Sequence, residues 1–163
     1  IPNFSIQINE KKHNNNNNND NNNNNNIIDS RLVESDTRKN MHLPSYYCVL
    51  CHLNVEEYLT HLFLHCPFSI ACWWSFQVTV PNSMNIFQIK ESIQSQLPAP
   101  FFMDVIVTMC WAIWSSRNDK IFRGIDNSIR RCKEIFKQEF AQVILRAKSD
   151  MQPSMKTWLQ AYV

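Results

Sequence analysis

The sequence predicts an all-α fold, and three observations support that prediction. Only one glycine, Gly124, occurs in 163 residues, whereas sheets and tight hairpins rely on glycine. Apolar side chains recur at helical spacing through most of the second half of the chain. Prolines separate these periodic stretches, as expected where helices end and begin. A hydrophobic content of 44%, with five tryptophans and ten phenylalanines, is enough for one packed core.

The first 40 residues do not carry the helical pattern. Two blocks of six asparagines, at positions 14–19 and 21–26, dominate this region. Such a tract cannot bury enough apolar surface to offset the entropy lost on ordering. We therefore expect residues 1–40 to be a disordered Asn-rich tail that carries no fold information. Prion-like self-association is the rival interpretation of the tract.

Three helices are expected in the middle of the chain. Residues 55–64 have a helical pattern, with Leu59 and Leu62 on one apolar face. Pro67 interrupts that pattern and suits the first turn of a new helix, which we expect over residues 67–77. Residues 86–97 have a weaker helical pattern that ends at a proline.

Three further helices are expected after residue 100. The stretch 101–122 is apolar nearly all round in its first part, which predicts the buried centre of the fold. Gly124 follows it at a cap position. Ser128 can cap the next helix, which runs to about residue 148 with one apolar face. A short last helix carries Trp158 and Leu159.

The recognisable chemistry of the chain lies in residues 48–66, which hold three cysteines and two histidines. A Cys-x-x-Cys pair followed at short range by His and Cys has metal-ligand spacing, and zinc takes four such ligands in a tetrahedron. We predict a zinc-knuckle-like loop whose ligands are Cys48, Cys51, His61 and Cys66. Cysteines used in this way favour a reducing, intracellular compartment, either nucleus or cytoplasm, over a secreted disulfide fold.

The fourth ligand of this set has an alternative. His65 follows His61 by four residues and would share its face on a helix, whereas His61 and Cys66 on one unbroken helix would diverge by roughly 140°. We expect Pro67 to let the chain turn at Cys66 and so remove this objection. His52 is a weaker candidate because it adjoins Cys51. Metal and fold should be lost together over residues 43–78.

Two separate stretches point to one family. Residues 38–51 read RKNMHLPSYYCVLC and are followed by THLFLHCPF at 60–68, and residues 111–118 read WAIWSSRN. Together they resemble the reverse-transcriptase zinc-binding domain of plant non-LTR (LINE-type) retroelements and the connector that follows it. The family hallmark is Cys-x-Leu-Cys, an acidic stretch, then His-Leu-Phe-x-x-Cys and a Trp, and Glu56-Glu57 match the acidic stretch.

The resemblance implies a zinc-binding module, associated with nucleic acid or a retroelement, that lacks catalytic activity of its own. It divides the chain into a tail at 1–40, a zinc module at 41–80 and a helical connector region at 81–163. The chain departs from the family at His52, where Gly is usual, and in the Asn tract, which replaces upstream helices. We therefore expect a fragment of a polyprotein. A degenerate retroelement remnant and a protein-interaction domain are the alternatives.

Charge is distributed unevenly along the chain. From residue 117 onward there are ten lysines and arginines against five acidic residues, whereas the preceding part has six against nine. Basic helices can bind phosphates, so weak binding of RNA or DNA is expected; a solvated helix face is the simpler interpretation. The candidate residues are Arg117, Arg130, Arg131, Lys133 and Lys137. No small-molecule substrate is expected. Nor is a membrane, because the longest apolar run falls short of the ~20 residues of a span.

Three other groups of residues have simpler interpretations. Glu56 and Glu57 are adjacent and would not face each other on a helix, so they are interpreted as charges at a helix N-terminus. The tryptophan pairs at 73/74 and 111/114 are interpreted as core residues rather than base-stacking platforms. The remaining cysteines are interpreted as buried packing residues, at positions Cys72, Cys110 and Cys132.

Overall fold

The computed structural model describes residues 46–82, 85–98 and 100–162. Within these ranges the chain forms helices and no strand, with one isolated antiparallel bridge between Tyr47 and Glu56. The fold is therefore all-α, as predicted. The predicted Asn-rich tail, residues 1–40, lies outside the described residues. Among the helices of the described part, none is both long and apolar enough to cross a lipid bilayer.

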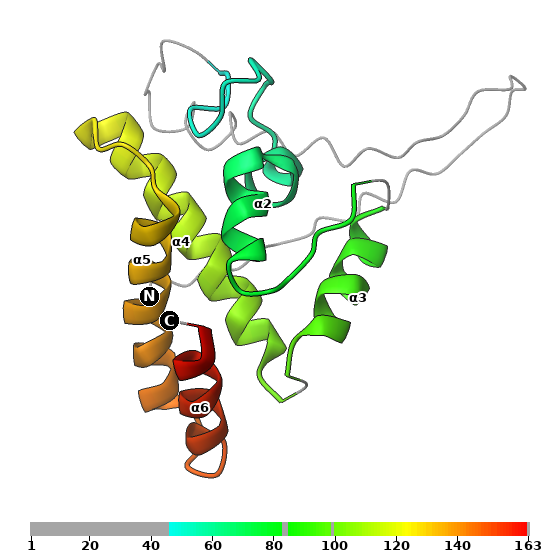
Figure 1. Ribbon diagram of the computed structural model, residues 1–163, viewed down its shortest axis with the longest axis vertical. Helices are drawn as coiled ribbons and strands as arrows, with labels where there is room; N and C mark the ends of the chain where they lie inside the picture. Colours follow the sequence, from blue (N-terminus) through cyan, green and yellow to red (C-terminus); the bar gives the residue numbers. More distant parts are fainter. Residues whose placement is uncertain (1–45, 83–84, 99, 163) are drawn as a thin grey trace, which may run out of the picture.

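The helices pack as an antiparallel pair with shorter helices laid against it (Figure 1). The long helices α4 (Phe102–Arg123) and α5 (Ile129–Arg146) form the pair. Helix α6 (Gln152–Tyr162) folds back along α5, and α2 (Pro67–Trp74) lies across both α4 and α5. A short π-helix, η1, precedes α2 and contacts α4. In chain order the elements are η1 (His61–His65), α2 (Pro67–Trp74), α3 (Ile86–Gln96), α4 (Phe102–Arg123), α5 (Ile129–Arg146) and α6 (Gln152–Tyr162).

The turn between α4 and α5 uses the two predicted caps. Gly124 ends α4 in the left-handed conformation, with φ of 63°, which glycine adopts without steric cost. The Ser128 side chain accepts a hydrogen bond of 3.2 Å from the backbone N–H of Arg131 at the start of α5. These caps satisfy backbone groups that the helix ends leave unpaired, so both cap predictions are confirmed.

Aromatic rings from four segments fill the core beneath α2. Phe76 and Phe136 approach to 4.5 Å between ring centroids, and Phe140 and Trp158 to 5.4 Å. Phe101 closes this group from the start of α4, 6.0 Å from Trp158. The core therefore joins α4, α5 and α6 with the segment after α2. At one end of the helix pair lie η1 and residues 46–57, the cysteine loop, which carries Cys48 and Cys51 (Figure 1).

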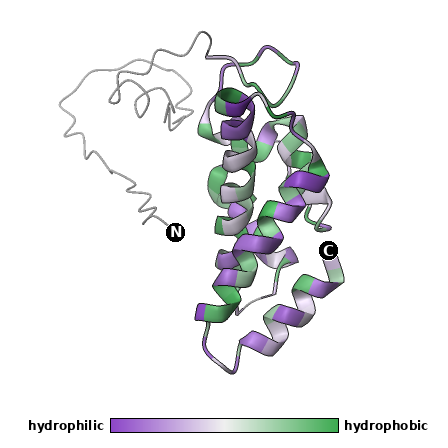
Figure 2. Ribbon diagram, turned by 90° about the vertical axis from the view of Figure 1, so that its left-hand side faces the viewer, coloured by the Kyte–Doolittle hydropathy of each residue, from purple (hydrophilic) through white to green (hydrophobic). Residues whose placement is uncertain are grey.

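Helix α4 is central but not buried all round. Val105 and Met109 are fully buried on the side that faces the core. On another side Met103 and Val107 are 47% and 49% exposed. Apolar and polar residues therefore share the outer surface of the bundle, as the hydropathy colouring in Figure 2 shows. The helix therefore lies at the centre of the fold as predicted, although part of its apolar surface remains exposed.

The predicted helix over residues 55–64 is correct only in its second half. The backbone N–H of Cys48 donates to the carbonyl of Val55 at 2.9 Å, and that of Glu57 donates to the carbonyl of Tyr46 at 2.9 Å. These bonds hold residues 55–57 extended against the segment that carries Cys48. Helical geometry begins only at Leu59. The pattern of apolar residues could not reveal this pairing, because it consists of backbone hydrogen bonds to the segment just before the turn.

Candidate metal centre

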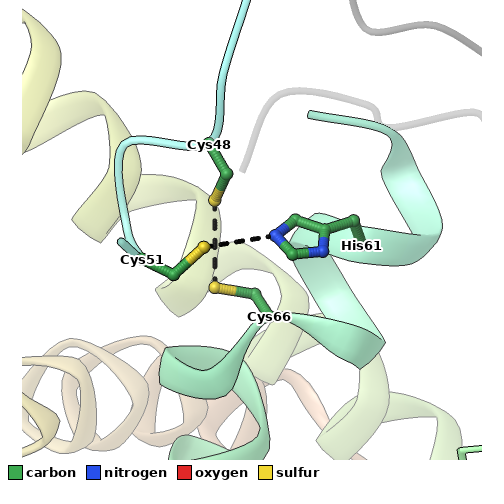
Figure 3. A group of neighbouring side chains, drawn as sticks. All are labelled: Cys48, Cys51, His61 and Cys66. Carbon is green, nitrogen blue, oxygen red and sulfur yellow. Dashed lines mark hydrogen bonds between the residues drawn. The ribbon is translucent and has the colours of Figure 1, made fainter. Parts of the chain in front are cut away.

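Four side chains converge at the end of the bundle (Figure 3). Their ligand atoms all lie within 4.8 Å of one another, and they belong to Cys48, Cys51, His61 and Cys66. The first two come from the turn between residues 46 and 57, the third is the first residue of η1, and the fourth is the N-cap of α2. The structure thus brings together all four residues of the predicted ligand set.

The spacing of these atoms fits a tetrahedral ion. The Sγ atoms of Cys48 and Cys66 are 3.8 Å apart, and Sγ of Cys51 is 3.5 Å from Nε2 of His61. A tetrahedron with Zn–S bonds of about 2.3 Å and a Zn–N bond of about 2.0 Å has S–S edges of ~3.8 Å and S–N edges of ~3.5 Å. A disulfide requires about 2.0 Å between sulfurs, and all six cysteines are free thiols. The residues present therefore fit a metal ion.

The cysteine loop is held by its own backbone and by the α4–α5 turn. Cys48 and Leu50 are 4% and 5% exposed, so the Cys-x-x-Cys segment is anchored in the core rather than free in solvent. The side-chain amide of Asn127 donates to the carbonyl of Leu50 at 3.4 Å. Asn54 reverses the chain with φ of 51°, a left-handed conformation that asparagine tolerates better than most residues.

A π-turn, rather than Pro67 alone, brings His61 and Cys66 together. The backbone N–H of Cys66 donates to the carbonyl of His61 at 2.7 Å, which is the i→i+5 bond of a π-helix. The wider turn aligns positions five apart that an α-helix would separate. Pro67 then opens α2 at its first position, as predicted. The π-turn thus brings His61 and Cys66 together before the chain reaches Pro67, whereas the sequence analysis attributed their approach to a turn permitted by Pro67.

Side chains of α2 fix the π-turn in place. The indole N–H of Trp73 donates to the carbonyl of Phe63 at 2.8 Å. The Ser69 hydroxyl donates to the carbonyl of Leu62. Trp73 and Ser69 are both fully buried, so η1 and α2 form one rigid corner that positions His61 and Cys66.

The two rival histidines lie outside this group. His65 is not among the four residues whose ligand atoms converge. Its Nε2 atom is buried without a hydrogen-bond partner among the described residues. Burial, and then the neighbouring His61, lower the pKa of His65. His52 is exposed on the loop. The geometry therefore favours Cys66 over His65 as the fourth ligand.

The protonation of the thiols suits a metal site. The hydrogen bond between Cys48 and Cys66 raises the pKa of Cys48 and lowers that of Cys66 to about 5. The backbone N–H groups of Ser69 and Phe68, at the start of α2, contribute to this lower pKa of Cys66, since a helix N-terminus favours a thiolate. A cation would take the place of the proton that Cys48 and Cys66 share.

A buried ion pair joins the cysteine loop to α4. Nε of Arg117 donates to Oε1 of Glu57 at 2.7 Å, and the two side chains are 8% and 6% exposed. Two expectations are corrected here. Glu57 is not a charge at a helix N-terminus, because its segment is extended. Arg117 is not on the nucleic-acid surface, because Glu57 neutralises it inside the protein.

The other four predicted phosphate-binding residues reach the surface in different ways. Arg130 has a side chain 90% exposed and lies 3.8 Å from a carboxylate oxygen of Glu134. Arg131 is bound to Asp119 at 2.6 Å, which occupies part of its guanidinium. The remaining two are Lys133, whose Nζ lies 5.5 Å from the ring centroid of Phe76, and the exposed Lys137.

The other interpretations have mixed outcomes. Cys72 and Cys132 are buried as predicted, each 1% exposed, while Cys110 is only partly buried. Trp73 is buried, but Trp74 is 72% exposed, so the interpretation of this pair as core is wrong for its second member.

The fold and the site together define a small all-α protein with a candidate Cys3His metal centre. Comparison of the chain with protein-family models, with curated proteins and with solved structures found no match. The site itself is therefore the guide to function.

Proposed function

We propose that this chain is a zinc-binding module of the type found in plant non-LTR retroelements, that it associates with nucleic acid and that it catalyses no reaction itself. The convergence of Cys48, Cys51, His61 and Cys66 within 4.8 Å supports the metal part of the proposal. Three thiolates and one imidazole form a closed, four-coordinate set that is typical of structural zinc sites. Zinc would serve here to hold the cysteine loop on the helices.

The zinc content of purified variants tests the ligand set. Wild type should contain one zinc per chain by mass spectrometry, and Cys66→Ser should lose it because serine cannot supply a thiolate. His65→Ala should retain zinc. The matched control is Cys110→Ser, which changes a cysteine outside the centre and should also retain the metal. Zinc in Cys66→Ser together with none in His65→Ala would assign the fourth position to His65. A wild type without zinc would favour the degenerate-remnant alternative.

The basic surface of α5 supports the nucleic-acid part of the proposal. Arg130, Lys133 and Lys137 lie on the first half of α5, and their cationic groups can release counterions from phosphates. Few such contacts are available, so we expect micromolar or weaker affinity for single-stranded RNA that falls steeply with salt. Titration of labelled RNA at low and at physiological salt tests this. Absence of binding at low salt would contradict the association with nucleic acid.

A protein-interaction domain is the second candidate function. Met103 and Val107 form a half-exposed apolar edge on α4, and a contiguous apolar surface of this kind often meets another protein. Sedimentation of the purified chain tests the protein-interaction candidate, because a chain that associates through this edge would show a mass that rises with concentration. Replacing Val107 with Lys should then restore the monomer.

A further inference from the structure

The last residue of α2 is an exposed tryptophan. Trp74 is 72% exposed, whereas its neighbour Trp73 is fully buried. An indole is a large apolar surface that a folded chain gains by burying. Trp74 contributes little to the core, so its position calls for a different explanation.

The surroundings of Trp74 combine a hollow with positive charge. Trp74 and Ile129, the first residue of α5, line the same surface hollow of about 750 Å³, a size within the range of ligand clefts. Arg130 follows Ile129 and is 90% exposed. Lys133, one helical turn on, lies 5.5 Å from the ring centroid of Phe76, two residues after Trp74. Ile129 therefore brings the start of α5, the helix that carries Arg130 and Lys133, to the edge of the hollow beside the indole.

The acidic partner of Arg130, Glu134, does not neutralise it firmly. Glu134 lies 3.8 Å from Nε of Arg130, and its side chain is 60% exposed. An exposed pair of this kind is worth little and exchanges readily with other partners. The Arg130 guanidinium can therefore turn to a phosphate while Glu134 returns to solvent.

We propose that Trp74 is a stacking platform for a base of single-stranded nucleic acid, with the adjoining phosphates held by Arg130 and Lys133. The inference rests on the proposed function and names the site through which it acts. Indoles stack on any base because every base has a π-face, and cationic groups next to the platform can hold the phosphates that flank the stacked base. A cationic rim suits phosphates better than it suits an apolar protein segment.

Binding of labelled oligonucleotides by single-residue variants tests the platform. The probes are a dT12 and a U12 oligonucleotide and a 12-base-pair duplex, each titrated at low salt. Trp74→Ala should weaken binding of both single strands by about five- to a hundredfold and leave duplex binding unchanged, since duplex bases are already stacked. The control is Phe87→Ala, which removes a ring 67% exposed on α3 and should change affinity by less than about twofold.

A salt titration separates stacking from charge. Lys133→Gln should lower the slope of log affinity against log salt by about one, whereas Trp74→Ala should keep the wild-type slope. Unchanged single-strand binding in Trp74→Ala, with wild type still binding, would overturn the platform and leave the proposed function intact. Equal losses on single strand and duplex would also overturn it. Failure of wild type to bind any probe would overturn both.

Discussion

Glu57 and Arg117 form the contact that fixes the cysteine loop on α4. Removing one member of a buried pair leaves the other charge unpaired in the protein interior, at a cost of about 3–5 kcal/mol. We expect Glu57→Ala to lower the free energy of unfolding by that amount, measured by urea denaturation. The control Glu91→Ala, at an exposed position of α3, should change it by less than about 0.5 kcal/mol. Equal effects of the two variants would show that the pair does not stabilise the fold.

Replacing both members of this pair should cost far less than replacing one. The double variant Glu57→Leu with Arg117→Met puts apolar side chains in place of two charges, and such exchanges are often close to neutral. Urea denaturation of the double variant should therefore recover most of the stability lost in Glu57→Ala. No recovery would indicate that each side chain has a separate structural role.

Asp119 predicts how stability depends on pH. It accepts hydrogen bonds from Arg131 of α5 at 2.6 Å and from Arg123 at 3.1 Å. The bond from Arg131, and then that from Arg123, lower the pKa of Asp119. A carboxyl whose pKa is lower in the folded state stabilises the fold above its unfolded pKa and loses that effect as pH falls through the folded value.

We expect wild type to lose more stability than Asp119→Asn as the pH falls from about 4, the ordinary aspartate pKa, toward about 2. At neutral pH the variant should be modestly less stable, because amide–guanidinium contacts are weaker than ionic ones. Thermal melts across this range provide the measurement. Parallel pH profiles for the two proteins would show that the Asp119 contacts with α5 do not contribute.

At the scale of elements, the metal should hold only one corner of the molecule. The cysteine loop and η1 carry the four ligands, and η1 packs on α2 and α4; α2 contacts α4 and α5 as well and buries Trp73 completely. After chelation we expect amide hydrogen exchange to speed up over residues 46–66. Protection should persist in α4 and α5, where Phe136 and Phe140 are fully buried.

The sequence predicted that residues 43–78 would unfold when the metal is lost. The packing of α2 limits the expected region to residues 46–66. The sequence showed the helical pattern of α2 but not its packing partners. Hydrogen exchange with and without a chelator shows directly whether residues 67–78 lose protection together with residues 46–66. Loss of protection throughout α5 on chelation would mean that the metal supports the whole bundle.

The sequence predicted most of the helices well, including the short helices α2, α3 and α6, and it missed the conformation of residues 55–65. The ends of α4 and α5 were predictable because Gly124 and Ser128 act locally. The extended start of 55–64 and the π-turn were not. The first depends on hydrogen bonds with Tyr46 and Cys48, and the second is fixed by side chains of α2. The four converging ligands could be read from their spacing and types, but the exposure of Trp74 depends on how α2 packs against α5.

At the scale of the whole molecule, the Asn-rich tail should be dispensable. Residues 1–40 are dominated by two blocks of six asparagines, which cannot bury apolar surface against the bundle. A chain starting at residue 41 should keep the melting temperature and far-ultraviolet helicity of the full chain. A drop of more than a few degrees on truncation would show that the tail contributes to the fold.

The buried pair between the loop and α4 also sets an order of events on the ribosome. Arg117 follows Glu57 by 60 residues, so at ~5–20 residues per second its synthesis lags by roughly 3–12 s. All four candidate ligands have been translated by then. The nascent chain can therefore capture its ion before α4 exists, and the supply of zinc during translation would decide whether later helices dock onto a closed loop or an open one.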